Sequence, residues 1–272
     1  MENVMSTNDT LGERADTYNV LGVPISITTL DHASEMIHVW ARDAKGRMIF
    51  VRDVHGIMQA RKSNELMQLH KEAAMVTPDG MPLVWLGQLA KHPVKRTCGP
   101  DLMERLVADS EKTGLKHYFY GGKPGVAQAL KKILNQKYPN SNIVGLGTPP
   151  FRPLTNDELT EAAGEINRSG ADVVWVGIST PKQEFLMNDL CPMVTSTLIG
   201  VGAAFDFHLG AVTRAPKWMQ RLGLEWVWRL CSEPKRLWRR YLVLAPKFVV
   251  EVIISFIIGE RSTETQKKQS KR

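Results

Sequence analysis

The sequence predicts an α/β protein with a parallel, doubly wound sheet that is followed by a helical appendage. Short apolar segments alternate with helical segments of roughly a dozen residues between residues 48 and 201, which is typical of strands joined by helices. After Gly202 the alternation stops, and a basic segment rich in tryptophan follows. We therefore expect a core over residues 1–212 and a basic, Trp-rich appendage over residues 213–272 that ends in a disordered polar tail.

Composition narrows the class of protein. A hydrophobic fraction of 43% with 23% charged residues is ordinary for a globular protein, so most of the chain should fold. Residues 1–16 are polar and acidic, which does not fit a signal peptide. No run of 18 uncharged apolar residues occurs, so no transmembrane helix is expected. Three scattered cysteines predict neither a disulfide framework nor a structural zinc site, and they favour a reducing cytoplasm.

The first hundred residues predict a strand pair and then strands and helices in turn. The strand pair covers Tyr18 to Ile27 and turns at Gly22-Val23-Pro24, and Asp31 is a plausible cap for the helix that follows it. In order, we expect a helix over 33–44, a strand over 48–51, a helix over 55–69, a strand over 73–77, a helix over 81–90 and a helix that opens at Gly99.

The middle of the chain continues the alternation. We expect strands over 117–120, 142–145, 172–177 and 197–201, and helices over 126–136, 157–169 and 182–191. Parallel sheets of this kind bind ligands in the crevice at the carboxyl ends of their strands. The loops that follow the strands are therefore the places to look for a site.

Asp79 lies in such a loop, in Thr77-Pro78-Asp79-Gly80 after a short, nearly uncharged strand. A carboxylate on a glycine turn at the ligand edge could act as a general base that removes a proton from an attacking hydroxyl. The alternative is that Asp79 only caps the helix that follows, since Asp is common at that position.

Two further loops carry polar or flexible residues between a strand and a helix. Gly121-Gly122-Lys123-Pro124-Gly125 could bring backbone amides close to phosphate oxygens, although many such glycine loops are only tight turns. It matches neither a Walker A motif nor the GxGxxG of dehydrogenases. In the loop that reads GISTPKQE over 177–184, Gln183 could hold a sugar hydroxyl or a uracil edge, and Lys182 could reach a phosphate. The alternative is a helix start with Thr180 as the N-cap, Pro181 at the first helical position and the acidic Glu184 in the first turn.

Metal ligation is not predicted. Asp206 and His208 lie close together in sequence, as do Asp53 and His55, but neither pair has a further ligand nearby to complete a site. Neither pair forms a DxD motif of the kind that binds a metal–diphosphate complex.

The positive charge of the chain is concentrated in the appendage. The net charge is +7, and residues 213–247 alone contain nine Lys or Arg against two Glu. Such a segment indicates a polyanionic partner, which could be a diphosphate, an anionic lipid or a nucleic acid. Arginines at helical spacing beside Trp228 and Trp238 suit a diphosphate, and equally a membrane surface. The apolar stretch 248–258 reads as an interfacial or core-docking helix.

Taken together and in this order, the motifs resemble those of the WecG/TagA/CpsF glycosyltransferase family (glycosyltransferase family 26). The resemblance runs from about Tyr18 to about Tyr241. It rests on PDGMPLVW at 78–85, RTCGPDL at 96–102, the glycines at 121–122, GISTPKQE at 177–184, GVGAAFDFHLG at 200–210 and RAPKWMQRLGLEWVWRLCSEPKRLWRRY at 214–241.

The resemblance implies a Rossmann-like, mostly parallel α/β core with a helical C-terminal appendage. It also implies an inverting, metal-independent transfer of a sugar from a UDP-sugar to a polyprenyl-diphosphate-linked saccharide, with no cofactor. In the family the appendage is thought to close the active site, to contact the cytoplasmic face of the membrane and to compete with self-association. We therefore expect a peripheral protein on the inner face of the plasma membrane, possible homo-oligomers and no nucleic-acid partner.

The same resemblance assigns roles to residues. Asp79 falls on the proposed general base, Gln183 on a residue that lines the sugar site, and three appendage arginines on residues that close over the donor diphosphate. The substrate contacts expected from the motifs and the resemblance together are Thr77, Asp53, Gly121, Gly122, Gln183, Asp206, Arg229, Arg236 and Arg239.

One departure leaves the substrate open. Many members have a Thr-x-Asn stretch where this chain reads Val51-Arg52-Asp53-Val54-His55, so N-acetylmannosamine, its uronic acid and glucose are all compatible donors. Two alternatives of other classes are a membrane- or nucleic-acid-binding module without catalysis and an NAD-dependent enzyme. The first leaves the polar loops unexplained, and the second lacks the glycine fingerprint.

Overall fold

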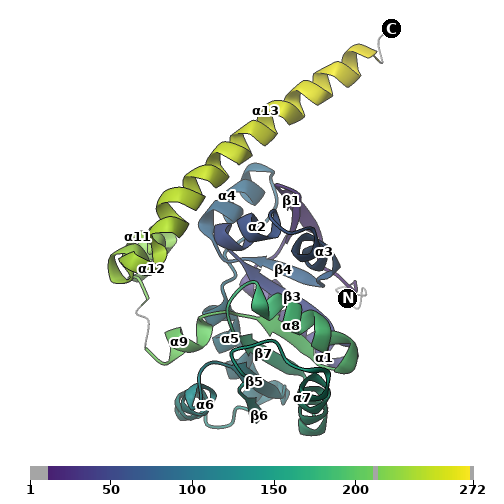
Figure 1. Ribbon diagram of the computed structural model, residues 1–272, viewed down its shortest axis with the longest axis vertical. Helices are drawn as coiled ribbons and strands as arrows, with labels where there is room; N and C mark the ends of the chain where they lie inside the picture. The colour runs from purple at the N-terminus through teal and green to yellow at the C-terminus, as the bar shows by residue number, and fades with distance from the viewer. Residues whose placement is uncertain (1–11, 211–213, 270–272) are drawn as a thin grey trace, which may run out of the picture.

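The computed structural model describes residues 12–210 and 214–269, without the side chains of 217, 221 and 259–269. It confirms the predicted α/β class, because a six-stranded parallel sheet forms the centre of the core (Figure 1). The strand order is β4-β3-β8-β7-β5-β6. The strands are β3 (Arg47–Arg52), β4 (Met75–Pro78), β5 (His117–Gly121), β6 (Ile143–Gly147), β7 (Val173–Gly177) and β8 (Thr197–Gly200).

Helices cover both faces of this sheet and bury an apolar cluster on each. One face packs against α2 (Val54–Ala60), α3 (Asn64–Glu72), α7 (Asn156–Ser169) and α8 (Lys182–Leu190). The other packs against α1 (Leu30–Arg42), α5 (Gly99–Thr113), α6 (Val126–Lys137) and the short α9 (Ala204–His208). The antiparallel pair β1 (Thr17–Val20) and β2 (Val23–Ser26) lies beside β4, and α4 (Met81–Leu89) follows β4.

The register of the sheet explains why its strands are almost continuously apolar. Phe119 pairs with Trp175, Trp175 with Ile199, and Ile199 with Ile49, so four fully buried side chains form one row across β5, β7, β8 and β3. All four belong to the same apolar cluster. A parallel sheet that is covered on both faces needs apolar side chains on both, which accounts for short strands without alternation.

Two predicted details of the core are wrong. The helix expected over 55–69 is two helices, α2 and α3, because the chain turns at Lys62 and the side chain of Ser63 caps a new helix by accepting a hydrogen bond from Leu66 N. The cap of α1 is Thr29, whose extended backbone places its hydroxyl to accept from His32 N, and Asp31 lies inside the first turn.

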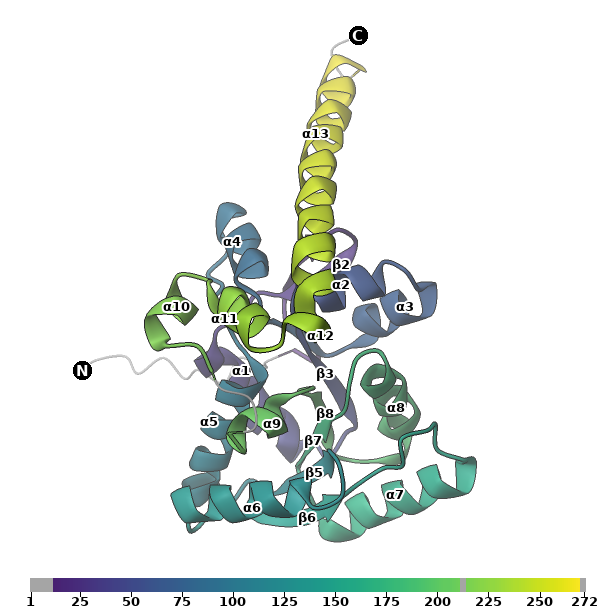
Figure 2. The same cartoon turned by 60° about the vertical axis from the view of Figure 1, so that its left-hand side comes forward.

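The appendage is helical, as expected, but broken into several segments. It contains α10 (Lys217–Arg221), α11 (Glu225–Ser232), α12 (Pro234–Trp238), the π-helical turn η2 (Arg239–Leu244) and α13 (Ala245–Gln269). The first three lie over one edge of the core, and α13 projects away from it (Figure 2). The helical backbone continues to Gln269, through most of the polar tail for which composition predicts disorder.

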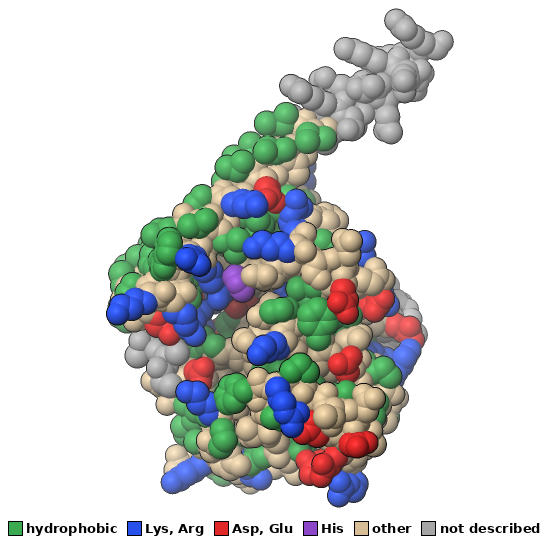
Figure 3. All heavy atoms as spheres, viewed as in Figure 1, with side chains coloured by type: hydrophobic (Ala, Val, Ile, Leu, Met, Phe, Trp, Pro, Cys, Tyr) green, Lys and Arg blue, Asp and Glu red, His purple; other side chains and the backbone are tan. Residues whose placement is uncertain are grey.

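By length and composition alone, one helical stretch of the appendage could cross a membrane, although no such helix is expected from the sequence. Residues Pro234–Ile258 form a continuous helical stretch with a mean hydropathy of 2.2 in its most apolar window, of which 6% is buried. The requirement of 18 uncharged residues was too strict, because such a window tolerates Lys247 and Glu251. Apolar side chains are exposed on the described part of α13, up to Ile258 (Figure 3).

Candidate functional site

The site lies where the carboxyl ends of β3, β4, β7 and β8 meet the appendage. Two adjoining cavities of about 220 and 570 Å³ occupy this junction. Lys and Arg side chains gather around a hollow on the surface near the base of α13 (Figure 3). Both cavities are lined by Asp53, His55, Asp79, Pro100, Phe207, Arg229 and Arg240. Both the core and the appendage therefore form the walls.

The two cavities differ in chemistry. The smaller one is bounded largely by apolar side chains, among them Met81, Pro82, Trp226 and Tyr241. The larger one is the more basic. It is lined by Lys62, Arg229, Arg236, Arg239 and Arg240, of which Arg236 and Arg240 pair closely with carboxylates. A ligand that joins an anionic part to an apolar or uncharged part could lie across both.

Asp79 is held at the boundary between the cavities by its own backbone. Its N–H donates to Arg52 O at the end of β3 (2.7 Å), which keeps the ends of β3 and β4 together. The alternative that Asp79 caps α4 is wrong, because the cap is Gly80 and α4 has no side-chain cap. The carboxylate is therefore free to face the cavities.

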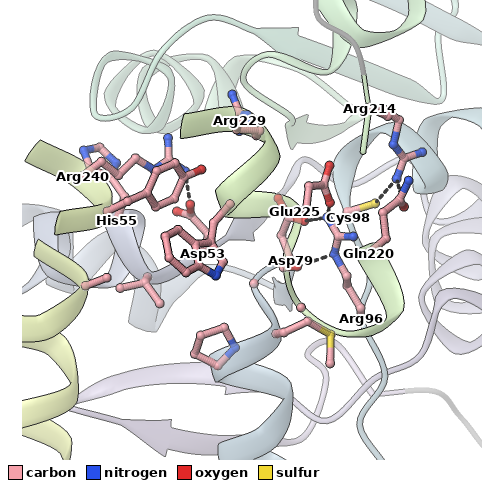
Figure 4. A pocket seen from close by; sticks show the side chains of 18 of the residues that line it. Asp53, His55, Asp79, Arg96, Cys98, Arg214, Gln220, Glu225, Arg229 and Arg240 are labelled. Atoms are coloured by element: carbon pink, nitrogen blue, oxygen red, sulfur yellow. Dashed lines mark hydrogen bonds and ion pairs between the residues drawn. The ribbon is translucent and has the colours of Figure 1, made fainter. Parts of the chain in front are cut away.

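One guanidinium connects Asp79 to the appendage. Arg96, in the loop before α5, donates from Nε to Asp79 O (2.7 Å) and from Nη2 to Asp79 Oδ1 (3.0 Å). The same Nη2 lies 2.7 Å from Oε2 of Glu225 in α11. Arg96 thus lies between the two carboxylates (Figure 4). Burial raises the pKa of Asp79 above its usual range, and the charges of Asp53 and Glu225 add to this effect against that of Arg96.

Asp53 forms a second link between core and appendage. Its Oδ1 accepts from Gly56 N (3.0 Å) and caps α2, and its Oδ2 pairs with Arg240 of η2 (Figure 4). Burial alone would raise the pKa of Asp53, but Arg240, His55 and the backbone amide lower it to about 2. Asp53 is therefore ionised at neutral pH.

Gln183 is fully buried and uses its amide group within the protein. Its Oε1 accepts from Gly202 N (3.1 Å), and its Nε2 donates to Glu184 Oε1 (2.8 Å). Glu184 also accepts from Thr180 Oγ1 (3.0 Å) and pairs with the buried Arg52. Gln183 thus ties the loop after β8 to the start of α8. The alternative that Thr180 caps α8 is not what is found, because no side chain caps that helix.

Arg52 at the end of β3 completes this buried network. Its Nε donates to His70 Nε2 (2.8 Å), and His70 Nδ1 donates to Leu66 O (2.6 Å). Burial and the nearby guanidinium lower the pKa of His70 to about 4, so the ring is neutral and can accept. The network lies beneath the larger cavity, of which Arg52 and Gln183 form part of the wall.

The three predicted appendage arginines differ in how strongly they are paired. Arg229 lies over the Phe207 ring (5.2 Å) with a buried Nε that has no hydrogen-bond partner, and its nearest carboxylate is Glu233 at 4.0 Å. Arg236 pairs with Glu233, and Arg239 lies over the Trp238 ring (5.2 Å). All three line the larger cavity, and Arg229 and Arg239 give it positive charge that no close carboxylate neutralises.

Comparison with known families agrees with this geometry. The model of the glycosyl transferase WecG/TagA/CpsF family matches residues 18–262. The chain belongs to this family. It is therefore a transferase enzyme, and a binding module without catalysis is not supported. The match covers both the α/β core and most of the appendage, so both belong to the family's architecture.

Other residues predicted for the glycosyltransferase site lie at its margins or outside it. Gly122 and Asp206 line a third cavity of about 670 Å³. It shares Ser179, Gly202, Ala203 and Arg236 with the basic cavity of about 570 Å³. Gly121 lines none of the three cavities. Its φ of +147° and the 2.6 Å that would separate a Cβ from Gly177 O require glycine for close packing of β5 on β7. Thr77 is buried in β4, with an unpaired hydroxyl.

Three important groups of this transferase site were not singled out from the sequence. Arg96 lies in the RTCGPDL motif, Glu225 is one of only two glutamates in the basic segment, and Tyr241 follows the paired arginines. Their only signal was membership in matching motifs, since nothing in their spacing predicts contact with Asp79 or Asp53. Within the described residues, no three His, Cys, Asp or Glu side chains are grouped as a metal site.

Proposed function

We propose that the protein transfers a sugar from a UDP-sugar to a polyprenyl-diphosphate-linked saccharide, with inversion at the anomeric carbon and without a metal. Asp79 removes the proton from the acceptor hydroxyl while the hydroxyl oxygen bonds to the anomeric carbon. The bond from that carbon to the diphosphate oxygen breaks at the same time, and UDP leaves with the electron pair.

The position of Asp79 between two unlike cavities carries this proposal. A general base in glycosyl transfer must reach the acceptor hydroxyl at the point where it meets the donor's anomeric carbon. The basic cavity suits the donor diphosphate, and the more apolar cavity suits the acceptor. Asp79 lines both. Its raised pKa makes it a better proton acceptor than an ordinary carboxylate.

The arginines of the basic cavity suit the leaving group. Negative charge develops on the diphosphate as its bond to the sugar breaks, and fixed cations that face it stabilise the transition state. We assign this role to Arg229, Arg236 and Arg239. Arg239 forms no described ion pair, and the ion pair of Arg229 with Glu233 is long, at 4.0 Å. Gln183 and Asp53 would place the sugar, with Gln183 acting through the loops that it joins.

The exposed apolar surface suits a lipid-linked acceptor and a peripheral position on the cytoplasmic face of the membrane. Trp85 and Leu89 of α4, Trp218 of α10 and Leu222 just after it are exposed. In α13, Phe248 is buried, and Glu251 pairs with Arg61 of the core (2.9 Å). While this contact holds, the apolar residues 252–258 extend only about 10 Å beyond it, against a hydrocarbon core of about 30 Å. Contact with one leaflet is therefore favoured over spanning.

A transfer assay tests the proposal directly. Purified protein is incubated with UDP-N-acetylmannosamine, its uronic acid or UDP-glucose and with short-chain polyprenyl-diphosphate saccharides, with and without EDTA. Mass spectrometry should find one product whose yield EDTA does not change. Loss of the product in EDTA would overturn the metal-independent mechanism, and failure to bind UDP at all would overturn the donor assignment.

A further inference from the structure

Among the described residues, Arg96 is the only cation that forms an ion pair with Asp79, and it also forms one with Glu225. Its Nη2 lies 3.0 Å from Asp79 Oδ1 and 2.7 Å from Glu225 Oε2. Glu225 is 14% exposed, so its charge is only weakly screened by solvent. No described residue hydrogen-bonds Asp79 Oδ2, which leaves that oxygen for a ligand.

A guanidinium that pairs with a single carboxylate lowers the proton affinity of that carboxylate and so makes it a weaker base. An opposite charge at hydrogen-bond distance favours the ionised form and lowers proton affinity. A second carboxylate on the same guanidinium has the reverse effect, since it neutralises the cation and adds a like charge nearby. Glu225 is therefore placed to counteract Arg96, and it comes from the appendage while Asp79 and Arg96 come from the core.

We propose that Glu225 is a positioning residue through which the docked appendage shares Arg96 with Asp79 and so keeps Asp79 an effective proton acceptor. The inference rests on the proposed role of Asp79 as the base. It makes docking of the appendage a condition for the reactivity of Asp79, in addition to closing the cavity. Without Glu225, the full charge of Arg96 would act on Asp79 and make it a weaker base.

Other charged and titratable groups also surround Asp79, and none of them replaces Glu225. From the core these are Asp53 at the start of α2, Arg96, and Cys98 before α5; from the appendage they are Glu225, Arg240 and Tyr241. Asp53 is already paired with Arg240. Glu225 is the one described carboxylate besides Asp79 that pairs with Arg96.

The first test measures the protonation of Asp79 without any substrate. The full-length protein is labelled with ¹³C at the Asp side-chain carboxyl, and the resonance of Asp79 is assigned from its loss in Asp79→Asn. In Glu225→Gln the titration midpoint of Asp79 should move to lower pH. An unchanged or raised midpoint would overturn the inference.

The same spectra separate a local effect from loss of docking. While the appendage is docked, Arg240 keeps Asp53 ionised at pH 3. In Glu225→Gln, Asp53 should stay ionised there; if it instead titrates near pH 4, Glu225 acts only through docking and the positioning role is wrong. The matched control is Glu251→Gln, which removes another ion pair between core and appendage. An equal shift of Asp79 in this control would also overturn the inference.

The second test uses the transfer assay. In Glu225→Gln, kcat should fall by about three- to tenfold, a part of the usual contribution of a general base. The acid limb of its pH profile should move to lower pH, while KM for the UDP-sugar changes little. Glu225→Asp should restore part of kcat. If the acid limb does not move in Glu225→Gln, Glu225 does not act through Asp79. If Asp79→Asn turns over at the normal rate, Asp79 is not the base.

Discussion

The core and the appendage are held by different forces. The core buries two apolar clusters, one on each face of the sheet, and of their buried residues only Phe248 comes from the appendage. The described part of the appendage is joined to the core by four ion pairs: Asp101–Arg214, Arg96–Glu225, Asp53–Arg240 and Arg61–Glu251. Most of the apolar packing therefore lies in the core, whereas the appendage is held by these ion pairs together with the packing of Phe248, Leu244 and Val252 on one cluster.

Removal of the appendage tests this division most severely. A chain that ends at Val212 keeps both apolar clusters apart from Phe248 and loses every arginine assigned to the diphosphate. We expect a folded core with no detectable transfer. Circular dichroism and thermal unfolding report the fold, and the transfer assay reports activity. Full activity of the truncated chain would mean that the appendage does not complete the site.

Asp79→Asn should have the next largest effect, because it removes the proposed base and leaves both the core and the arginines intact. We expect kcat to fall by about 10²- to 10⁴-fold, with UDP affinity nearly unchanged. Isothermal titration with UDP and single-turnover transfer would measure the two quantities. A variant that turns over at the normal rate would exclude Asp79 as the base.

The same division explains what could be predicted from the sequence. The strands and helices of the core were predictable because burial imposes apolar patterns, as in the row from Phe119 to Ile49. The break at Ser63 was missed because an exposed turn leaves the apolar pattern of the two helices unchanged. The location of Asp79 at the ligand edge was predictable because the end of β4 positions it locally.

The contacts that complete the site were not predictable in the same way. Arg96 and Glu225 are 129 positions apart in sequence, and no local pattern marks them as partners. Likewise, the internal hydrogen bonds of Gln183 depend on the loops after β7 and β8, which meet only in the folded core. A basic segment predicts that an anion binds somewhere, but the pairing of its charges decides which arginines are free to bind it.

Destabilising substitutions should lower the free energy of unfolding by more in the core than in the appendage. Phe119→Ala empties a fully buried position in the row across the sheet and should lower the free energy of unfolding by about 3–5 kcal/mol. Glu251→Gln removes a partly exposed ion pair and should lower it by less than about 1 kcal/mol. Urea unfolding of both variants in the same detergent gives the comparison. Equal losses would mean that the ion pairs contribute as much as the core.

The smallest expected effect is the pH dependence of docking through Asp53 and Arg240. The pKa of Asp53 is about 2 in the docked protein, below its usual value of about 3.9. A lowered pKa means that the ion pair contributes fully above about pH 4 and that this contribution is lost as pH falls toward 2. Acid should therefore loosen the appendage by protonating Asp53, and it should have less effect in Arg240→Gln, where the partner is already absent.

Fluorescence energy transfer can follow this loosening, since Cys231 on α11 is exposed and Glu161 on α7 is also exposed. Dyes are placed on Cys231 and on Glu161→Cys, with Cys191 replaced by serine, and the transfer efficiency is recorded between pH 5 and pH 2.5. The efficiency should fall with pH in the protein that retains Arg240 and should change less in Arg240→Gln. If both proteins respond alike, the acid response arises from the other carboxylates at the junction, and the Asp53–Arg240 pair is not what ties docking to pH.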